Sequence, residues 1–252
     1  MRILITNDDG IDSKGLYALA LAVQQLGFEA VVAAPSKNMS GASASLMPFD
    51  DFDRVSVKEM NIPELEGIQS FSVGAPPALI VMLSTLGGFG DPPDLVVAGV
   101  NLGPNTGRST LFSGTIAAVK TGARFNCPGI AVSLNYHPSV DDHRHWETAK
   151  EMVSRPIKWL TSVPTAMMLN INIPNKPISE VLGFRQAGLA HIGRVQTVIT
   201  SKDKDGISIE LEPCDDLVEE GTDSDLLDKG YATVTALEPA REALVDMPIN
   251  EW

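Results

Sequence analysis

Apolar runs and helix-like patterns alternate along the first 174 residues of the chain. Short apolar runs predict buried strands at residues 2–6, 29–35, 94–99, 129–134 and 166–173. Between them, apolar residues at helical spacing predict helices at residues 15–27, 74–86, 113–123 and 146–160. Because strands that alternate with helices form parallel sheets, the pattern predicts the α/β class, with a mostly parallel, Rossmann-like sheet.

The first predicted strand ends in a polar turn that contains two adjacent acids. The apolar run Ile3–Ile5 is followed by Asn7, Asp8, Asp9 and Gly10. Because successive side chains of a strand point to opposite faces, the two acids can share a target only where the strand has ended. This places them at the carboxyl edge of the sheet, where open α/β sheets build ligand sites. The residues suit either an Asx-turn with an aspartate helix cap or a site for a hard metal ion, and taken alone they favour the turn.

Two later polar stretches are predicted at the same edge of the sheet. The loop 36–45 begins where the second strand ends and brings the Ser40 hydroxyl there, either as a flexible linker or as part of a site. Asn101 follows the third strand almost directly. Ser113, Gly114 and Thr115 then open a helix, where free N–H groups and the helix dipole favour an anion. Ordinary N-capping by Ser113 explains the same residues, and the two roles are compatible.

From about residue 175 the pattern changes to short β-like segments. They lie at 181–186, 194–200, 207–212 and 231–237, and they predict antiparallel hairpins appended to the parallel core. A further hairpin or meander is predicted within residues 48–71. We therefore divide the chain into a core domain, residues 1–174, and an extension, residues 175–252, that packs on a partner subunit. The acidic run 215–228 matches no calcium loop, so it predicts a solvated face.

Composition narrows the possible partners. The 252 residues carry a net charge of −13, which argues against a DNA or RNA backbone as a ligand. The first strand–helix turn lacks G-x-G-x-x-G, so dinucleotide binding has no support. Cys127 and Cys214 show no metal-ligand spacing, and no apolar run is as long as a membrane span. We expect no signal peptide, because the sequence becomes polar already at residues 6–10. We expect a soluble cytoplasmic protein with no membrane partner.

Four short motifs, in this order and at these separations, resemble the SurE family of survival-protein nucleotidases. They are TNDDG (6–10), SG (40–41), GVNLGPN (99–105) and FSGT (112–115). The similarity continues in LNINIP (169–174) and in TD followed by GYATVTAL (222–237), so it covers most of the chain. The resemblance implies a 5′-nucleotidase with a three-layer α/β/α sandwich that forms a homodimer or homotetramer through a C-terminal β-hairpin extension.

The resemblance also implies a reaction and a set of site residues. The reaction is metal-dependent hydrolysis of nucleoside 5′- or 3′-monophosphates with one Mg²⁺ or Mn²⁺ ion. The metal ligands correspond to Asp8, Asp9, Ser40 and Asn101, and the two aspartates are also the expected catalytic residues. The expected phosphate- and substrate-binding residues are Asn7, Asn105, Ser113, Gly114 and Thr115. The nucleophile is either a metal-activated water, with Asp8 or Asp9 as base, or one of these carboxylates itself.

Three stretches depart from the family pattern. In one of them, small residues follow the SG of 40–41 where the family usually has a polar residue. Residues 74–81, GAPPALIV, lack the threonine, acid and cysteine that are usual there, and Arg108 stands in a stretch that is usually acidic. These departures bear on substrate preference and subunit packing rather than on the metal ligands. The alternatives are a non-catalytic nucleotide or metal sensor and a hydrolase for polyphosphate or another phosphoester.

Overall fold

The computed structural model describes residues 1–49, 51–138, 141–163, 166–192, 195–213 and 218–240. Its main feature is a nine-stranded sheet with the order β3-β4-β2-β1-β5-β6-β7-β11-β8. The strands are β1 (Arg2–Thr6), β2 (Glu29–Pro35), β3 (Val57–Met60), β4 (Gln69–Val73), β5 (Leu95–Leu102), β6 (Gly129–Asn135), β7 (Met168–Pro174), β8 (Phe184–Gln186) and β11 (Ala232–Leu237). The five strands predicted in the core are all present, and β4, β2, β1, β5, β6 and β7 run parallel.

The order of the strands places a topological switch point between β1 and β5. The chain leaves β1 for β2 and β4 on one side, and then returns to β5, β6 and β7 on the other side. In sheets of this kind the loops at the carboxyl ends of the two central strands diverge and leave a crevice, which is where ligands bind. Here those two ends carry the acidic turn after β1 and the Asn101 segment of β5.

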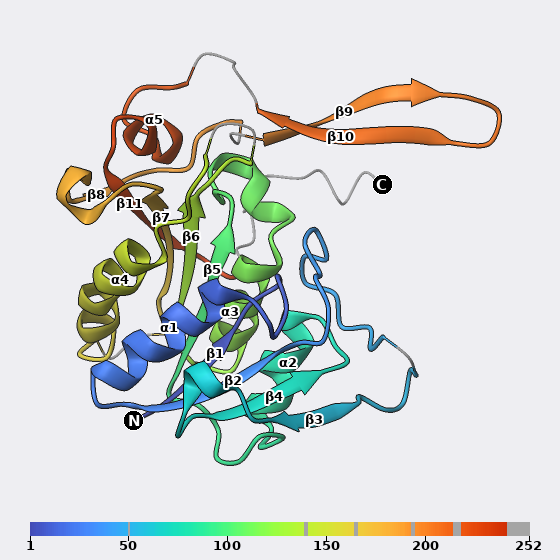
Figure 1. The fold of residues 1–252 in the computed structure, drawn as a ribbon, viewed down its shortest axis with the longest axis vertical. Helices are drawn as coiled ribbons and strands as arrows, with labels where there is room; N and C mark the ends of the chain where they lie inside the picture. The colour runs from blue at the N-terminus through green and yellow to red at the C-terminus, as the bar shows by residue number, and fades with distance from the viewer. Residues whose placement is uncertain (50, 139–140, 164–165, 193–194, 214–217, 241–252) are drawn as a thin grey trace, which may run out of the picture.

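Helices cover both faces of the sheet, as Figure 1 shows. On one face α1 (Lys14–Gln25) and α4 (Trp146–Leu160) pack over Ile3 and Ile5 of β1. On the other face α2 (Pro77–Thr85) and α3 (Gly114–Arg124) pack over Leu4. The alternation of Ile3, Leu4 and Ile5 therefore supplies both cores, because neighbouring residues of a strand face opposite sides. The predicted three-layer α/β/α sandwich is confirmed.

Strand β5 extends further than the sequence predicts. The apolar pattern ends at Gly99, but the strand continues to Leu102 and includes Asn101. Its pairing with β6 is interrupted between Ala98 and Asn101, where Gly99 has a φ of +126°. A Cβ at Gly99 would lie 2.2 Å from the carbonyl oxygen of Val132. This position therefore needs glycine, both for its backbone conformation and for the close approach of β6.

The inserted and C-terminal segments are only partly as predicted. The segment at 48–71 forms a hairpin-like pair in which β3 lies antiparallel to β4. β9 (Val195–Lys202) and β10 (Ile207–Pro213) form the predicted antiparallel hairpin, which projects from the body of the molecule in Figure 1. The predictions for 181–186 and 231–237 were wrong in one respect, because β8 and β11 are not appended hairpins but join the main sheet next to β7. The domain boundary at residue 174 stays a prediction.

The acidic run also differs from its prediction. Asp215 and Asp216 lie outside the described residues. Asp223 begins the short helix α5 (Asp223–Asp228) and is fully buried, so the prediction of a solvated face was wrong for this residue. Among the described residues, no helix combines the length and apolar character that crossing a membrane requires.

Candidate active site

Asp8 lies at the carboxyl end of β1 and is almost fully buried, with 3% of its surface exposed. Its Oδ1 accepts a hydrogen bond of 2.6 Å from the Thr115 hydroxyl, and its Oδ2 accepts one of 3.2 Å from the Thr115 backbone N–H. Gly114 packs against the same side chain, because a Cβ there would lie 2.8 Å from Oδ2. The N-terminus of α3 is therefore built against the Asp8 carboxylate.

Asp9 lies beside Asp8 but is less enclosed. Its Oδ2 accepts a hydrogen bond of 3.3 Å from the backbone N–H of Leu102, which ties the turn to the end of β5. Burial, together with the charge of Asp8, raises the pKa of Asp9 to about 6. Burial also raises the pKa of Asp8, although the hydrogen bonds from Thr115 oppose the rise. Two carboxylates that burial penalises in this way would be stabilised by a cation between them.

Asn7 holds the shape of the acidic turn. Its side-chain amide donates to the Gly10 carbonyl at 3.0 Å and accepts from the Gly10 N–H at 3.1 Å. The residue is fully buried. A polar turn is therefore present, closed by Asn7 and Gly10, and it presents the two acids. The expected aspartate helix cap was wrong, because Ser13 is the N-cap residue of α1. The turn does not compete with a functional site. As a substrate-binding residue, Asn7 stays a prediction.

The loop after β2 reaches the acidic turn through its backbone. The Met39 N–H donates to the Asp8 carbonyl at 2.6 Å, and the next residue, Ser40, is exposed. On the other side of the turn, Asn101 donates through its Nδ2 to the Gly103 carbonyl at 2.7 Å. This bond orients the Asn101 amide and leaves its oxygen as an acceptor. Two carboxylates, an amide oxygen and a hydroxyl are a donor set that suits Mg²⁺ or Mn²⁺.

Asn105 is the centre of a buried polar cluster beneath the site. Its Nδ2 donates to the Ser133 hydroxyl at 2.8 Å, and its N–H donates to Asn172 Oδ1 at 2.8 Å. Its carbonyl accepts from the amides of Asn170 and Asn172 at 2.8 and 3.0 Å. The structure thus commits Asn105 to neighbours on β6 and β7, and its predicted contact with substrate stays a prediction. The motifs do not predict this cluster, although two asparagines two positions apart in a buried strand indicate one polar face.

The residues Ser113–Thr115 combine capping with support of Asp8. The Ser113 hydroxyl accepts from the Ile116 N–H at 3.2 Å, so the N-capping role is confirmed. Thr115 donates both its hydroxyl and its N–H to the Asp8 carboxylate. The anion bound at the N-terminus of α3 is thus the Asp8 carboxylate, whose ionised form the helix dipole stabilises. The Ser113 O–H can still donate to a ligand next to Asp8.

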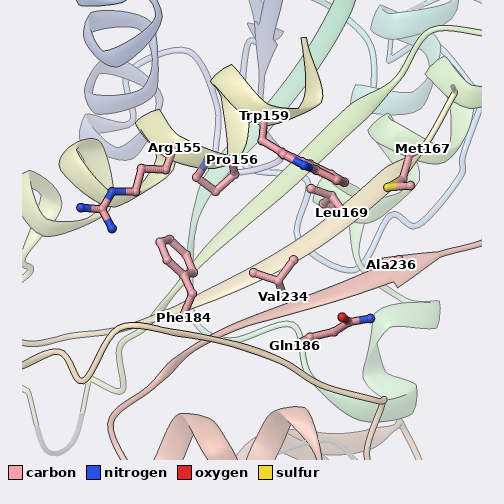
Figure 2. A pocket seen from close by; sticks show the side chains of 9 residues that line it. All are labelled: Arg155, Pro156, Trp159, Met167, Leu169, Phe184, Gln186, Val234 and Ala236. Atoms are coloured by element: carbon pink, nitrogen blue, oxygen red, sulfur yellow. The ribbon is translucent and has the colours of Figure 1, made fainter. Parts of the chain in front are cut away.

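A separate apolar cavity lies away from these residues. The cavity has a volume of about 400 Å³ and lies over β7, β11 and β8. Figure 2 shows it beside α4, with Trp159 and Phe184 among the side chains that line it. Its full lining is Arg155, Pro156, Trp159, Met167, Leu169, Phe184, Gln186, Val234 and Ala236. This lining has no carboxylate, and none of the predicted site residues belongs to it. The predicted metal and phosphate site is therefore separate from this cavity.

Comparison with known proteins identifies the same family as the motifs. Residues 3–196 match the family described as "Survival protein SurE". The chain is 35% identical over 242 residues to the 5′/3′-nucleotidase SurE of Cronobacter sakazakii, covering 94% of this chain and 90% of that protein. It is 34% identical to the 5′-nucleotidase SurE of Aeromonas hydrophila, covering 94% and 92%. The crystal structure of the SurE protein from Aquifex aeolicus superposes with a TM-score of 0.75 at 28% identity, covering 95% of this chain and 94% of that one. The chain therefore belongs to the SurE family.

Proposed function

We propose that the protein is a metal-dependent 5′-nucleotidase, which hydrolyses nucleoside 5′-monophosphates to nucleoside and phosphate and also accepts 3′-monophosphates. The observation that carries the proposal is the pair Asp8–Asp9 at the switch point of the sheet. Asp8 is buried and accepts the Thr115 N–H at the N-terminus of α3, and Asp9 lies beside it. The names of the related proteins, 5′-nucleotidase and 5′/3′-nucleotidase, support the same activity.

The donor set defines how the chain would hold a metal ion. Asp8 and Asp9 supply the charge, and Ser40 and Asn101 supply neutral oxygens from two other loops. When bound, one Mg²⁺ or Mn²⁺ ion would offset the charge of the phosphate and make a water molecule more acidic. The hydrogen bonds from Thr115 to Asp8 and from Leu102 to Asp9 orient the two carboxylates before any ligand arrives.

The phosphate is proposed to bind where α3 begins. The Ser113 O–H and the Gly114 N–H are the proposed phosphate donors, and Thr115, which is bonded to Asp8, holds the start of α3 beside them. Asn7 and Asn105 hold the turn and the loop on either side. Positioning matters here because phosphate-monoester hydrolysis is among the slowest uncatalysed reactions. The nucleophile is either a water, with Asp8 or Asp9 accepting its proton, or one of these carboxylates. Trapping a phosphorylated aspartate during turnover separates the two routes.

Phosphate release from a panel of nucleoside monophosphates tests the proposal. The protein is first treated with EDTA and then supplied with Mg²⁺ or Mn²⁺, and short polyphosphate is included as a competing substrate class. The expected result is release from nucleotides only when metal is present. Folded protein that binds nucleotide without releasing phosphate under any metal would point to a sensor, and preferred release from polyphosphate would point to a different hydrolase.

The extension is proposed to form the contacts of a homodimer or homotetramer. The hairpin β9–β10 projects from the body of the molecule and exposes Ile199, Ile207 and Ile209 by 67%, 55% and 63% (Figure 1). Exposed apolar residues that gather on a projecting element mark a surface for protein–protein contact. The mass in solution, measured by light scattering, tests this proposal. The cytoplasmic location stays a prediction.

A further inference from the structure

Asp223 is a buried carboxylate outside the predicted site whose contacts join two distant segments. Its Oδ2 accepts from the Gly107 N–H at 2.9 Å, across 116 positions of sequence. Its Oδ1 accepts from the N–H groups of Ala190 and Ser224, both at 2.9 Å. The Asp223 N–H in turn donates to the Gly188 carbonyl at 2.9 Å. The residue thus connects α5, the segment 188–192 that leads toward β9, and the loop that leads to α3.

The junction around Gly107 is tightly packed. Gly107 has a φ of +56°, a conformation that favours glycine. A Cβ at this position would lie 2.6 Å from the Ile192 carbonyl oxygen and 2.9 Å from that of Ala190. The backbone of 188–192 therefore lies directly against the loop, and the Asp223 carboxylate closes the contact between them.

The loop 105–113, which contains the short 3-10 helix η2 (Gly107–Leu111), runs from this junction to the proposed phosphate site. It begins at Asn105, which β6 and β7 hold through Ser133 and Asn172. Within the loop, the Thr110 hydroxyl donates to the Gly107 carbonyl at 2.9 Å. The loop ends at Ser113, the N-cap of α3, two residues before Thr115 binds Asp8. A shift of the Gly107 backbone would therefore also move the phosphate donors, because only residues 108–112 separate them.

We propose that Asp223 is a positioning residue that couples the base of the C-terminal hairpin to the phosphate-binding loop. This inference rests on the proposed phosphatase function. Asp223 has no place among the reacting groups, because three backbone N–H groups occupy its two oxygens. Its role is to hold Gly107, and through it residues 108–113, in the conformation that presents Ser113 and Gly114. The metal ligands Asp8 and Asp9 lie outside this loop.

Asp223→Asn tests the proposal with a change that keeps the size of the side chain. One acceptor oxygen becomes an NH₂ donor that faces a backbone N–H, so a buried hydrogen bond is lost. The expected effect is about a tenfold fall in kcat/KM, the size that follows from losing a hydrogen bond to a charged group. This fall is expected to come mainly from a rise in KM, with an equal rise in the inhibition constant of inorganic phosphate. The dissociation constant of Mn²⁺ is expected to stay within about twofold, since this loop supplies no metal ligand.

Asp225→Asn is the matched control. Asp225 lies on the same helix and also accepts a backbone N–H, from Gly221 at 2.8 Å, and it binds Lys229. Among the described residues, the Gly107 N–H bonds to Asp223 and not to Asp225. Its variant is expected to keep kcat/KM within about twofold of wild type. An equal loss in both variants would overturn the proposal, as would a wild-type phosphate inhibition constant in Asp223→Asn or a matching loss of Mn²⁺ affinity.

Hydrogen exchange gives a readout that does not depend on activity. Asp223→Asn is expected to speed amide exchange in peptides covering 105–113 and 188–192, while peptides covering β1 exchange as in wild type. If the wild-type protein hydrolyses no nucleotide, the proposed function fails, but this measurement still decides whether Asp223 holds the loop. Unchanged exchange in 105–113 would overturn the positioning role.

Gly107→Ala disrupts the same junction on its loop side and leaves the Asp223 carboxylate unchanged. It serves in particular if Asp223→Asn does not fold. Because the added methyl would collide with the Ile192 carbonyl, the same rise in KM and in the phosphate inhibition constant is expected. Combined in one chain, the two substitutions are expected to lower kcat/KM by less than the product of their separate effects, since both disrupt one contact. Independent, multiplying effects would overturn the coupling.

Discussion

Asp8 and Asp223 are both buried carboxylates near the start of a helix, and both accept backbone N–H groups. Asp8 receives the N–H and the hydroxyl of Thr115, and a second carboxylate, Asp9, lies next to it. Asp223 receives three backbone N–H groups, from Gly107, Ala190 and Ser224. Burial raises the pKa of each, and hydrogen bonds oppose the rise in each.

The difference between these two aspartates lies in their neighbours rather than in their burial. At Asp8 the adjacent acid adds negative charge that the surrounding N–H groups do not offset, so a cation suits the site. At Asp223 the backbone donors occupy both oxygens, so the carboxylate acts as a clamp between chain segments. A buried acid is therefore a candidate for catalysis or metal binding when the surrounding donors do not offset its negative charge.

The largest effect is expected from neutralising the acidic turn. Asp8→Asn and Asp9→Asn are each expected to lower kcat by about 10³-fold or more, because each removes a charged ligand of the proposed metal site. Initial rates at saturating nucleotide measure this, with circular dichroism as the test of folding. Asp12→Asn, an exposed acid just after the turn, is the control. Activity within about tenfold of wild type in both variants would contradict the assignment.

A methyl group placed against Asp8 is expected to have the next largest effect. In Gly114→Ala the Cβ would lie 2.8 Å from Asp8 Oδ2, so the carboxylate or the start of α3 must move. Overpacking of this kind costs about 1–3 kcal/mol, and the misplaced ligand is expected to lower kcat about 10- to 100-fold. Thermal unfolding and steady-state rates measure the two effects.

Gly206→Ala is the matched control for this overpacking. Gly206 lies in the turn of the β9–β10 hairpin, where a Cβ meets no atom within 4 Å. Its variant is expected to match wild type in both measurements. If Gly114→Ala behaved in the same way, Asp8 would not be held as tightly as its contacts indicate.

Metal binding is expected to stabilise the fold through the site at the acidic turn and not through Asp223. At a Mn²⁺ concentration about 100 times its dissociation constant, the gain is about 2.7 kcal/mol. For a chain of this size that gain corresponds to a rise in Tm of about 5–10 °C, measured by differential scanning calorimetry. The rise is expected to vanish in Asp9→Asn and to persist in Asp223→Asn. A rise lost in both would mean that the two aspartates do not differ as proposed.

The smallest effect on the fold is expected at the hairpin. Ile209 is exposed on β10, opposite Ile199, so within the protomer Ile209→Asp removes little packing besides this cross-strand contact. The free energy of unfolding is expected to change by about 1 kcal/mol or less, as measured by urea denaturation. The mass by light scattering is expected to fall toward that of a single chain. Lys204→Thr, at the exposed turn of the same hairpin, is the control, and an unchanged mass in Ile209→Asp would exclude this face as the subunit contact.

Local patterns were enough to predict the core of this molecule. The apolar runs at β1, β2, β5, β6 and β7 and the helical spacing between them predict the layers, because strand and helix periodicities are written in neighbouring residues. The acidic turn was predicted for the same reason, since Asn7–Gly10 directly follows an apolar run. The motifs shared with the SurE family then named the candidate ligands.

Contacts between distant residues decided the rest. The sequence does not show that β8 and β11 close the edge of the main sheet, because short alternating segments fit a hairpin equally well. It also does not show that Asn105 is held by Asn170 and Asn172, or that Asp223 lies under Gly107 and not in solvent. An acidic residue is predicted to be solvated unless donors surround it, and here those donors come from segments up to 116 positions away. Only the folded chain brings these donors together. For that reason the structure alone shows the role of Asp223, whereas the sequence already indicates that of Asp8.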